Sequence, residues 1–146
     1  MPTENADVPP CFVWPVRIYY ENTDAGGVVY HCDYVAFLER ARTEFLRSMA
    51  IELGALEKSH AVLFAIRSVQ IEYLKPARLD DLLQVTVGFK ALRSASIVFS
   101  QKILRQDEVL CEAEVRVVAI SSNTFRPTAV PEFMYERLDQ VSKVGR

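Results

Sequence analysis

Hydrophobic and polar residues alternate along five stretches of this chain, the pattern of β-strands with one buried face. The first stretch places Phe12, Trp14, Val16, Ile18 and Tyr20 on the same side. The other stretches span residues 62–75, 83–89, 97–103 and 109–119. Short connections between the last four stretches predict an antiparallel meander.

Two of these strands carry irregular features. Pro15 cannot donate to a neighbouring strand, so the first strand is expected at a sheet edge or at a bulge. The first half of residues 62–75 is almost entirely apolar, which predicts burial on both faces or a bulge. Turns are predicted at residues 76–81, 93–94 and 106–108.

Between the first and second strands, apolar residues recur every three or four positions, which predicts an amphipathic helix. This stripe consists of Tyr34, Phe37, Leu38, Ala41, Phe45 and Met49. Charged residues, including Arg42, occupy the other positions and are expected to face water, and Gly54 is the expected stop near the helix end. A short helix is predicted at residues 133–140.

This order of elements predicts one α+β domain. We expect the domain at residues 12–140, a flexible N-terminal arm at residues 1–11 and a C-terminal tail at residues 141–146. One helix cannot cover both faces of a five-stranded sheet, and long exposed strand edges are commonly buried in an assembly. The pattern therefore predicts a homodimer or homotetramer.

Composition and charge exclude several classes of protein. The 146 residues have a net charge of −2 and no basic run, which argues against nucleic-acid binding. Cys11, Cys32 and Cys111 lack the spacing of a disulfide framework or a metal site, and Cys32 is expected to be a small buried residue. Residues 1–10 do not resemble a signal peptide, and no apolar run has the ~18 residues of a membrane span. A cytoplasmic location is expected.

Residues 20–31 are the strongest candidate for chemistry, because Asp24, Gly26 and Gly27 form a short loop before the helix. A helix N-terminus presents unpaired N–H groups, and glycines let a ligand approach the backbone closely. A carboxylate beside such an end is suited to attack on a carbonyl whose oxygen needs stabilisation. The alternative is that residues 22–24 only cap the helix and the glycines only form a turn.

This loop, the helical segment 34–44 and the stretch 73–81 resemble the hotdog-fold acyl-CoA thioesterases of the 4-hydroxybenzoyl-CoA thioesterase type. Among these, the chain is most similar to the thioesterases associated with the Tol-Pal system, over roughly residues 12–140. The resemblance implies an antiparallel five-stranded sheet wrapped around one long helix. It also implies that two such units join into one continuous sheet, with active sites at the dimer interface.

The resemblance further assigns residues to the site. It implies that Asp24 is the catalytic carboxylate and that the main-chain N–H of His31 polarises the substrate carbonyl. The implied substrate-binding residues are Gly26 and Gly27 in the loop, Phe64, Ala65 and Ile66 along the pantetheine channel, and Arg93, Ser94 and Ser96 at the turn that contacts CoA. Family members usually carry an acid where this chain has Asn22. No metal or cofactor is implied, since CoA arrives with the substrate.

The residues leave the mechanism open, because Asp24 can either attack the thioester directly or deprotonate water. The ring of His31 is expected to pack or to position the loop, and His60 is expected in a polar loop. The leading hypothesis is hydrolysis of acyl-CoA, with acyl carrier protein as another possible acyl donor. The alternatives are hydration or dehydration of an acyl thioester, and a non-catalytic acyl-binding or interaction module of the Tol-Pal system that associates peripherally with the inner membrane.

Overall fold

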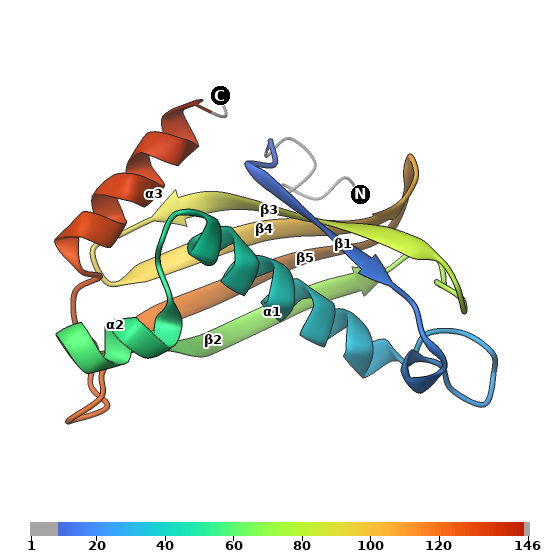
Figure 1. Ribbon diagram of the computed structural model, residues 1–146, viewed down its shortest axis with the longest axis horizontal. Helices are drawn as coiled ribbons and strands as arrows, with labels where there is room; N and C mark the ends of the chain where they lie inside the picture. The colour runs from blue at the N-terminus through green and yellow to red at the C-terminus, as the bar shows by residue number, and fades with distance from the viewer. Residues whose placement is uncertain (1–8, 145–146) are drawn as a thin grey trace.

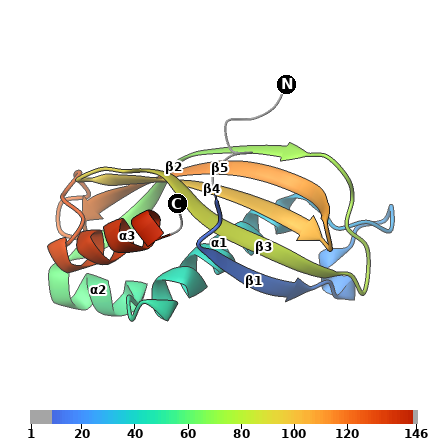
Figure 2. The ribbon, with the colours of Figure 1, turned by 90° about the horizontal axis from the view of Figure 1, so that it is seen from above.

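A curved antiparallel sheet wraps around one long helix, α1 (His31–Ser48), in the computed structural model, which describes residues 9–144 (Figure 1, Figure 2). The five strands are β1 (Phe12–Arg17), β2 (Val62–Tyr73), β3 (Leu82–Leu92), β4 (Ser96–Arg105) and β5 (Glu108–Ser121). Their order is β1-β3-β4-β5-β2, and all neighbours are antiparallel. The predicted meander is therefore correct for β3, β4 and β5 but wrong for β2, which pairs with β5 because β1 occupies the other side of β3. The predicted α+β class and hotdog arrangement are confirmed.

The edges of this sheet are β1 and β2. Pro15 lies in β1 opposite Gln84 of β3. The predicted edge position of Pro15 is therefore confirmed. Proline is tolerated in this strand because an edge strand has a neighbour on one side only, so not every residue must donate an N–H to another strand. The pairing of β2 with β5 shifts between Ile66 and Ser68. This shift confirms the bulge that the apolar start of the strand predicted.

The apolar face of α1 forms the centre of the core. Its buried apolar residues are Tyr34, Phe37, Leu38, Ala41, Phe45 and Leu46. They share one cluster with inward-facing strand residues such as Leu83, Val85, Phe99, Ile103 and Val115. Burial of each large side chain contributes about 1.5–3 kcal/mol. This packing fixes α1 against the sheet, and with it the position of the first residue of the helix.

The helical region does not end near Gly54, so that prediction is wrong. The first helix already ends at Ser48, and Ala50 follows with a φ of 60°. The N–H groups of Ala50 and Ile51 bond back to the carbonyls of Arg47 and Leu46, at 2.9 and 3.0 Å. This is a Schellman ending, in which glycine commonly stands where this chain has alanine.

A second helix, α2 (Leu53–His60), follows and contains Gly54. His60 is therefore the last residue of a helix and does not lie in a polar loop. Its ring lies 5.2 Å from the ring of Phe133. The expectation for His60 failed because the short α2 was not separated from α1 in the sequence pattern.

Arg42 is buried, with 8% of its surface exposed, although it was expected to face water. Its guanidinium donates to Gln101 Oε1 at 3.0 Å and lies 5.9 Å from the centre of the Phe99 ring. Gln101 is fully buried in β4 and also donates to the main-chain oxygen of Leu38 at 3.1 Å. Burial lowers the pKa of Arg42 to about 10. The polar Gln101 inside the core gives the guanidinium its partner.

A terminal helix, α3 (Glu132–Val144), lies with α2 at the end of the molecule opposite the loop that precedes α1 (Figure 1). Met134 and Leu138 anchor it in the core. The helix extends beyond the predicted residues 133–140 on both sides. Residues 1–8 of the predicted arm and residues 145–146 of the predicted tail lie outside the described part of the chain.

The three cysteines are all free thiols. Burial raises the pKa of Cys11 to about 11 and that of Cys111 to about 12. Cys32 is exposed in the first turn of α1, so its predicted burial is wrong. Within residues 9–144, no cluster of three or more His, Cys, Asp or Glu side chains is arranged to hold a metal ion. None of the helices described here has the length and apolar character of a membrane span.

Candidate functional site

The loop that carries Asp24 connects the 3-10 helix η2 (Tyr20–Asn22) to α1. The N–H of Asp24 donates to the oxygen of Val28 at 2.9 Å, and the N–H of Gly27 donates to the oxygen of Asp24 at 3.0 Å. Gly27 has a φ of 78°, which residues with a side chain rarely adopt. The tight turn therefore depends on glycine at this position.

One oxygen of the Asp24 carboxylate accepts a hydrogen bond, and the other has no hydrogen-bond donor among the described residues. Its Oδ1 accepts the N–H of Gly26 at 2.8 Å, and the residue is exposed. A Cβ at residue 26 would stand 3.2 Å from this oxygen, so glycine leaves the carboxylate room. No described residue donates to Oδ2. A carboxylate oxygen without a hydrogen-bond partner is available to act as a nucleophile or as a general base.

The start of α1 lies next to this loop and offers free donors. Tyr30 occupies the N-cap position and supplies no side-chain cap. Within the described residues, the N–H groups of His31 and Cys32 donate to no acceptor, whereas the N–H of Asp33 bonds to the oxygen of Tyr30 at 2.9 Å. Such free N–H groups, reinforced by the helix dipole, can stabilise a developing oxyanion.

The groups around the start of α1 affect the pKa of the Tyr30 phenol. This pKa is raised chiefly by the neighbouring Cys32 side chain, then by desolvation, and further by the charges of Asp33 and Asp24. The ring of Tyr30 lies 4.6 Å from the ring of His31. Asp24 thus contributes to the same electrostatic environment as the first turn of α1.

Two tyrosines hold the first turns of α1 against the rest of the fold. Tyr73, the last residue of β2, donates from its hydroxyl to the main-chain oxygen of His31 at 2.9 Å. The Tyr34 hydroxyl accepts the N–H of Ala77 at 3.0 Å, and the oxygen of Ala77 accepts the N–H of Val29 at 2.9 Å. Sequence reasoning gave neither tyrosine a role at the site. The only signal for Tyr73 was its place in the stretch 73–81.

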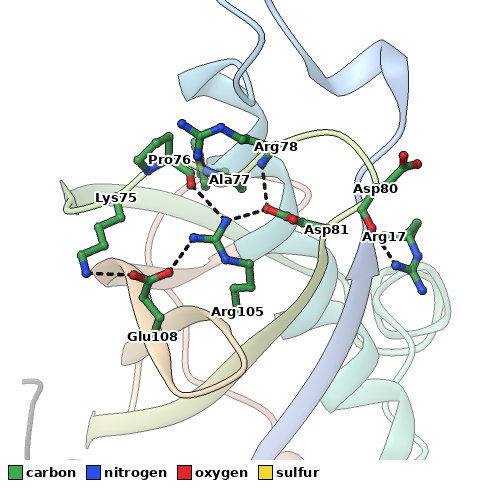
Figure 3. Close-up of polar contacts among 10 residues, drawn as sticks. Arg17, Lys75, Pro76, Ala77, Arg78, Asp80, Asp81, Arg105 and Glu108 are labelled. Atoms are coloured by element: carbon green, nitrogen blue, oxygen red, sulfur yellow. Dashed lines mark hydrogen bonds and ion pairs between the residues drawn. The ribbon is translucent and has the colours of Figure 1, made fainter.

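Ion pairs brace the connection between β2 and β3 beneath this region (Figure 3). Arg105 contacts Asp81 Oδ2 at 2.7 Å and Glu108 Oε1 at 2.5 Å. Lys75 contacts the other oxygen of Glu108 at 2.8 Å. Hydrogen bonds from Lys75 and Arg105 lower the pKa of Glu108. The network therefore holds both ends of the connection whose Ala77 supports the loop before α1.

The other predicted substrate-binding residues lie at the opposite end of the sheet. Arg93 and Ser94 form the turn between β3 and β4, where the N–H of Arg93 donates to the oxygen of Ser96 at 2.9 Å. Ser96 pairs with Val118, which pairs on its other side with Ala65. The predicted turn and the predicted channel residues Phe64, Ala65 and Ile66 are therefore neighbours.

These residues are distant from Asp24 within one chain. Phe64 and Tyr73 are nine residues apart in β2, which corresponds to about 30 Å along the strand. Tyr73 contacts His31, so Asp24 and the helix start lie at one end of β2 and the residues 64–66 lie at the other. The structure brings the predicted residues together in two groups, and these two groups lie apart from each other within one chain.

Two surface hollows flank η2. One has a volume of about 260 Å³ and a lining that includes Trp14, Arg17, Asn22 and Arg40. The other has a volume of about 600 Å³, and its lining includes Leu79 and two residues of η2, Tyr20 and Glu21. Asp24 lines neither of them.

Comparisons with known proteins place this geometry in a family. The model of the thioesterase-like superfamily matches residues 18–138. The acyl-CoA thioester hydrolase YbgC of Escherichia coli is 46% identical over 88% of this chain and 96% of its own length. The acyl-CoA thioesterase YbgC of Haemophilus influenzae is 40% identical over 83% of this chain and 89% of its own length.

Solved structures agree with these sequence relatives. A hypothetical protein from Thermus thermophilus superimposes with a TM-score of 0.83 at 26% identity, over 89% of this chain and 98% of its own. A structure from Bartonella henselae, described as a probable thioesterase, superimposes with a TM-score of 0.78 at 31% identity, over 82% of this chain and 98% of its own. The chain belongs to the thioesterase-like superfamily.

Proposed function

We propose that this protein hydrolyses acyl-CoA thioesters to a free carboxylic acid and CoA, with Asp24 as the reacting carboxylate. The observation that carries the proposal is a carboxylate anchored by Gly26 in the loop directly before the free N–H groups that begin α1. The YbgC relatives are acyl-CoA thioester hydrolases by name and match most of the chain, which supports this substrate class.

Asp24 acts in one of two ways. As a nucleophile, its Oδ2 adds to the thioester carbonyl, the oxyanion accepts the N–H of His31, and collapse expels the CoA thiolate to leave a mixed anhydride. Water then cleaves the anhydride to release the acid and regenerate the carboxylate. As a general base, Asp24 takes a proton from water, the resulting hydroxide adds to the carbonyl, and the proton finally reaches the leaving thiolate.

A single turnover in water labelled with ¹⁸O distinguishes these routes. Attack by water on the Asp24 carbonyl of an anhydride places the label in the enzyme and leaves the first product acid unlabelled. General-base catalysis places the label in the product acid and none in Asp24. Attack on the acyl carbonyl of an anhydride also labels the product, so trapping the anhydride with hydroxylamine completes the test.

A second copy of the chain supplies the remaining residues of this proposed site. The outer edge of β2 has no strand neighbour within the described chain, and Ile66, Val69 and Tyr73 are exposed along it. Antiparallel pairing of β2 with the β2 of a partner, centred near Val69, would set residues 64–66 opposite the partner's Tyr73. The channel residues of each subunit would then meet Asp24 of the other.

The composite site is tested with mixed dimers. Asp24→Asn and Ala65→Trp each inactivate both sites of a homodimer, one by removing the carboxylate and one by blocking the channel. A heterodimer isolated with two affinity tags contains one site with both defects and one intact site, so about half of the wild-type activity is expected. No recovery of activity, or a monomer in light scattering, contradicts the shared site.

Thiol release from short-chain, long-chain and aromatic acyl-CoAs tests the proposed activity. The wild type is expected to release CoA, and Asp24→Asn is expected to lose about 100-fold or more in kcat, since general-base or nucleophilic groups contribute at least this much. If neither protein releases thiol, hydrolysis is refuted. Tight acyl-CoA binding without turnover would then favour the non-catalytic acyl-binding module.

A further inference from the structure

Asn22, where the chain departs from the usual acid of the resembled family, is a well-connected residue. Only 9% of its surface is exposed. Its Oδ1 accepts the N–H of Tyr19 at 2.8 Å, and its Nδ2 donates to Asp33 Oδ2 at 3.0 Å. Its main-chain oxygen accepts the N–H of Tyr30 at 2.8 Å. Asn22 therefore ties the start of the Asp24 loop to both its end and the first turn of α1.

The two partners determine which way the Asn22 amide points. An N–H of the main chain requires an acceptor, and an ionised carboxylate requires a donor, so Oδ1 must face Tyr19 and Nδ2 must face Asp33. The negative charge of Asp33 is favoured at the positive end of the α1 dipole. The pair thus combines one amide with one acid and contains a single negative charge.

We propose that Asn22 and Asp33 form a positioning pair that fixes the Asp24 loop against the start of α1 and works with the amide and the acid in either order. The proposal rests on the proposed hydrolysis at Asp24. The pair does not touch the reacting atoms; it sets how the Asp24 carboxylate lies relative to the N–H of His31. Misplacement of such groups by about 1 Å lowers rates by about 100-fold.

Exchange of acid and amide preserves every contact. With Asp at residue 22 and Asn at residue 33, a carboxylate oxygen accepts the N–H of Tyr19, and the other accepts the amide donor from residue 33. With Asp at both positions, two carboxylate oxygens would face each other at about the present 3.0 Å. Like charges at that distance cannot both remain ionised, so the loop separates from α1 or one acid binds a proton.

Other charged or titratable groups surround the pair. Tyr30, Cys32 and Asp24 share its electrostatic environment. The hollow that Asn22 lines also includes Arg17, Tyr19, Glu21 and Arg40. These groups are identical in all variants below, so a difference in pH profile between the variants reports on residues 22 and 33.

The test compares Asn22→Asp, Asp33→Asn and the exchanged double variant with the wild type, using acyl-CoA hydrolysis from about pH 5 to pH 9. Asn22→Asp is expected to lose about 10-fold or more in kcat at high pH, with little change in KM, because adjacent groups commonly couple this strongly. Its activity should recover as the pH falls, because protonation of the raised-pKa pair restores a donor. Asp33→Asn keeps an acceptor for Asn22 and should stay within about three-fold of the wild type.

The double variant is the decisive protein. It should recover to within about three-fold of wild-type kcat and lose the acid-shifted profile, because its pair again holds one charge. Thermal melting monitors folding of all four proteins. Full activity of Asn22→Asp at high pH refutes the pair, as does a folded double variant that stays inactive. Inactive wild-type protein refutes the proposed hydrolysis itself, so the two failures are distinguishable.

Discussion

The hydroxyl of Tyr73 donates a hydrogen bond to the main-chain oxygen of His31 at 2.9 Å and joins the end of β2 to the first residue of α1. The two residues are 42 positions apart in the chain. The ring of Tyr73 also packs edge-on against Tyr34, with 5.4 Å between ring centres. The end of β2, the strand that we propose pairs with a second copy of the chain, therefore contacts the first turn of α1. The N–H groups of this turn are those that we propose stabilise the oxyanion.

Removal of this hydroxyl tests the connection. Tyr73→Phe keeps the ring packing and is expected to lower kcat several-fold with little change in KM, because α1 loses an anchor and the substrate loses no contact. The lost hydrogen bond costs about 1 kcal/mol of unfolding free energy. Tyr135→Phe in α3, whose hydroxyl has no hydrogen bond within the described chain, is the control and should change neither quantity. Equal kcat values for the two variants would contradict the role of Tyr73.

Substitution of Gly27 and of Gly54 by alanine gives a matched comparison, because a Cβ added at either residue would meet no other atom within 4 Å. Gly27→Ala forces alanine into a φ of 78° and should destabilise the protein by roughly 1–2 kcal/mol, with reduced hydrolysis. Gly54→Ala lies in α2 and should raise stability by up to about 1 kcal/mol and leave hydrolysis unchanged. Urea unfolding and thiol release measure both effects. A fully active and stable Gly27→Ala protein would show that the loop does not depend on this conformation.

The Glu108 network predicts a pH dependence of stability. Lys75 and Arg105 lower the pKa of Glu108 in the folded state. The network therefore contributes fully to the stability of the fold above the ordinary pKa of 4.5, and this contribution is lost as the pH falls through the lowered pKa. Glu108→Gln should therefore melt below the wild type at neutral pH, with the gap closing in acid. Glu57→Gln, at an exposed site in α2, should show no such gap. A gap that is independent of pH would contradict this assignment.

The buried pair of Arg42 and Gln101 predicts strong coupling. Gln101→Leu leaves a buried cation without its acceptor and should cost about 3 kcal/mol or more of unfolding free energy. Arg42→Met with Gln101→Leu removes both polar groups and should be more stable than Gln101→Leu alone. Urea unfolding of the two single variants and the double variant measures the coupling. Additive effects would show that the two side chains act independently.

The sequence predicted the strands and the helix stripe because these features follow from local periodicity. The neighbour of β2 was predicted wrongly, since local periodicity does not show that this strand pairs with β5 and not with β3. The break after Ser48 was missed, since Ala50 adopts the left-handed conformation that usually signals itself by glycine. The burial of Arg42 was missed for a different reason. Its partner Gln101 lies 59 residues away, and helix periodicity carries no information about a polar residue on a distant strand.

At the site, the loop was predictable because Asp24, Gly26 and Gly27 stand close together in sequence. The contacts that hold this loop were not predictable in the same way. Asn22 reaches Asp33 across the loop, and Tyr73 reaches His31 from another element. The separation of about 30 Å between the two groups of proposed site residues also required the strand geometry.

The pairing of Asn22 with Asp33 has a consequence for how related sequences can diverge. Of the four ways to place an acid or an amide at these positions, only two acids leave no donor between the side chains. A lineage can therefore pass from one single-acid arrangement to the other through the double amide, one substitution at a time, without losing the hydrogen bond. An acid at residue 22 in one member and at residue 33 in another would then be two versions of the same structural solution.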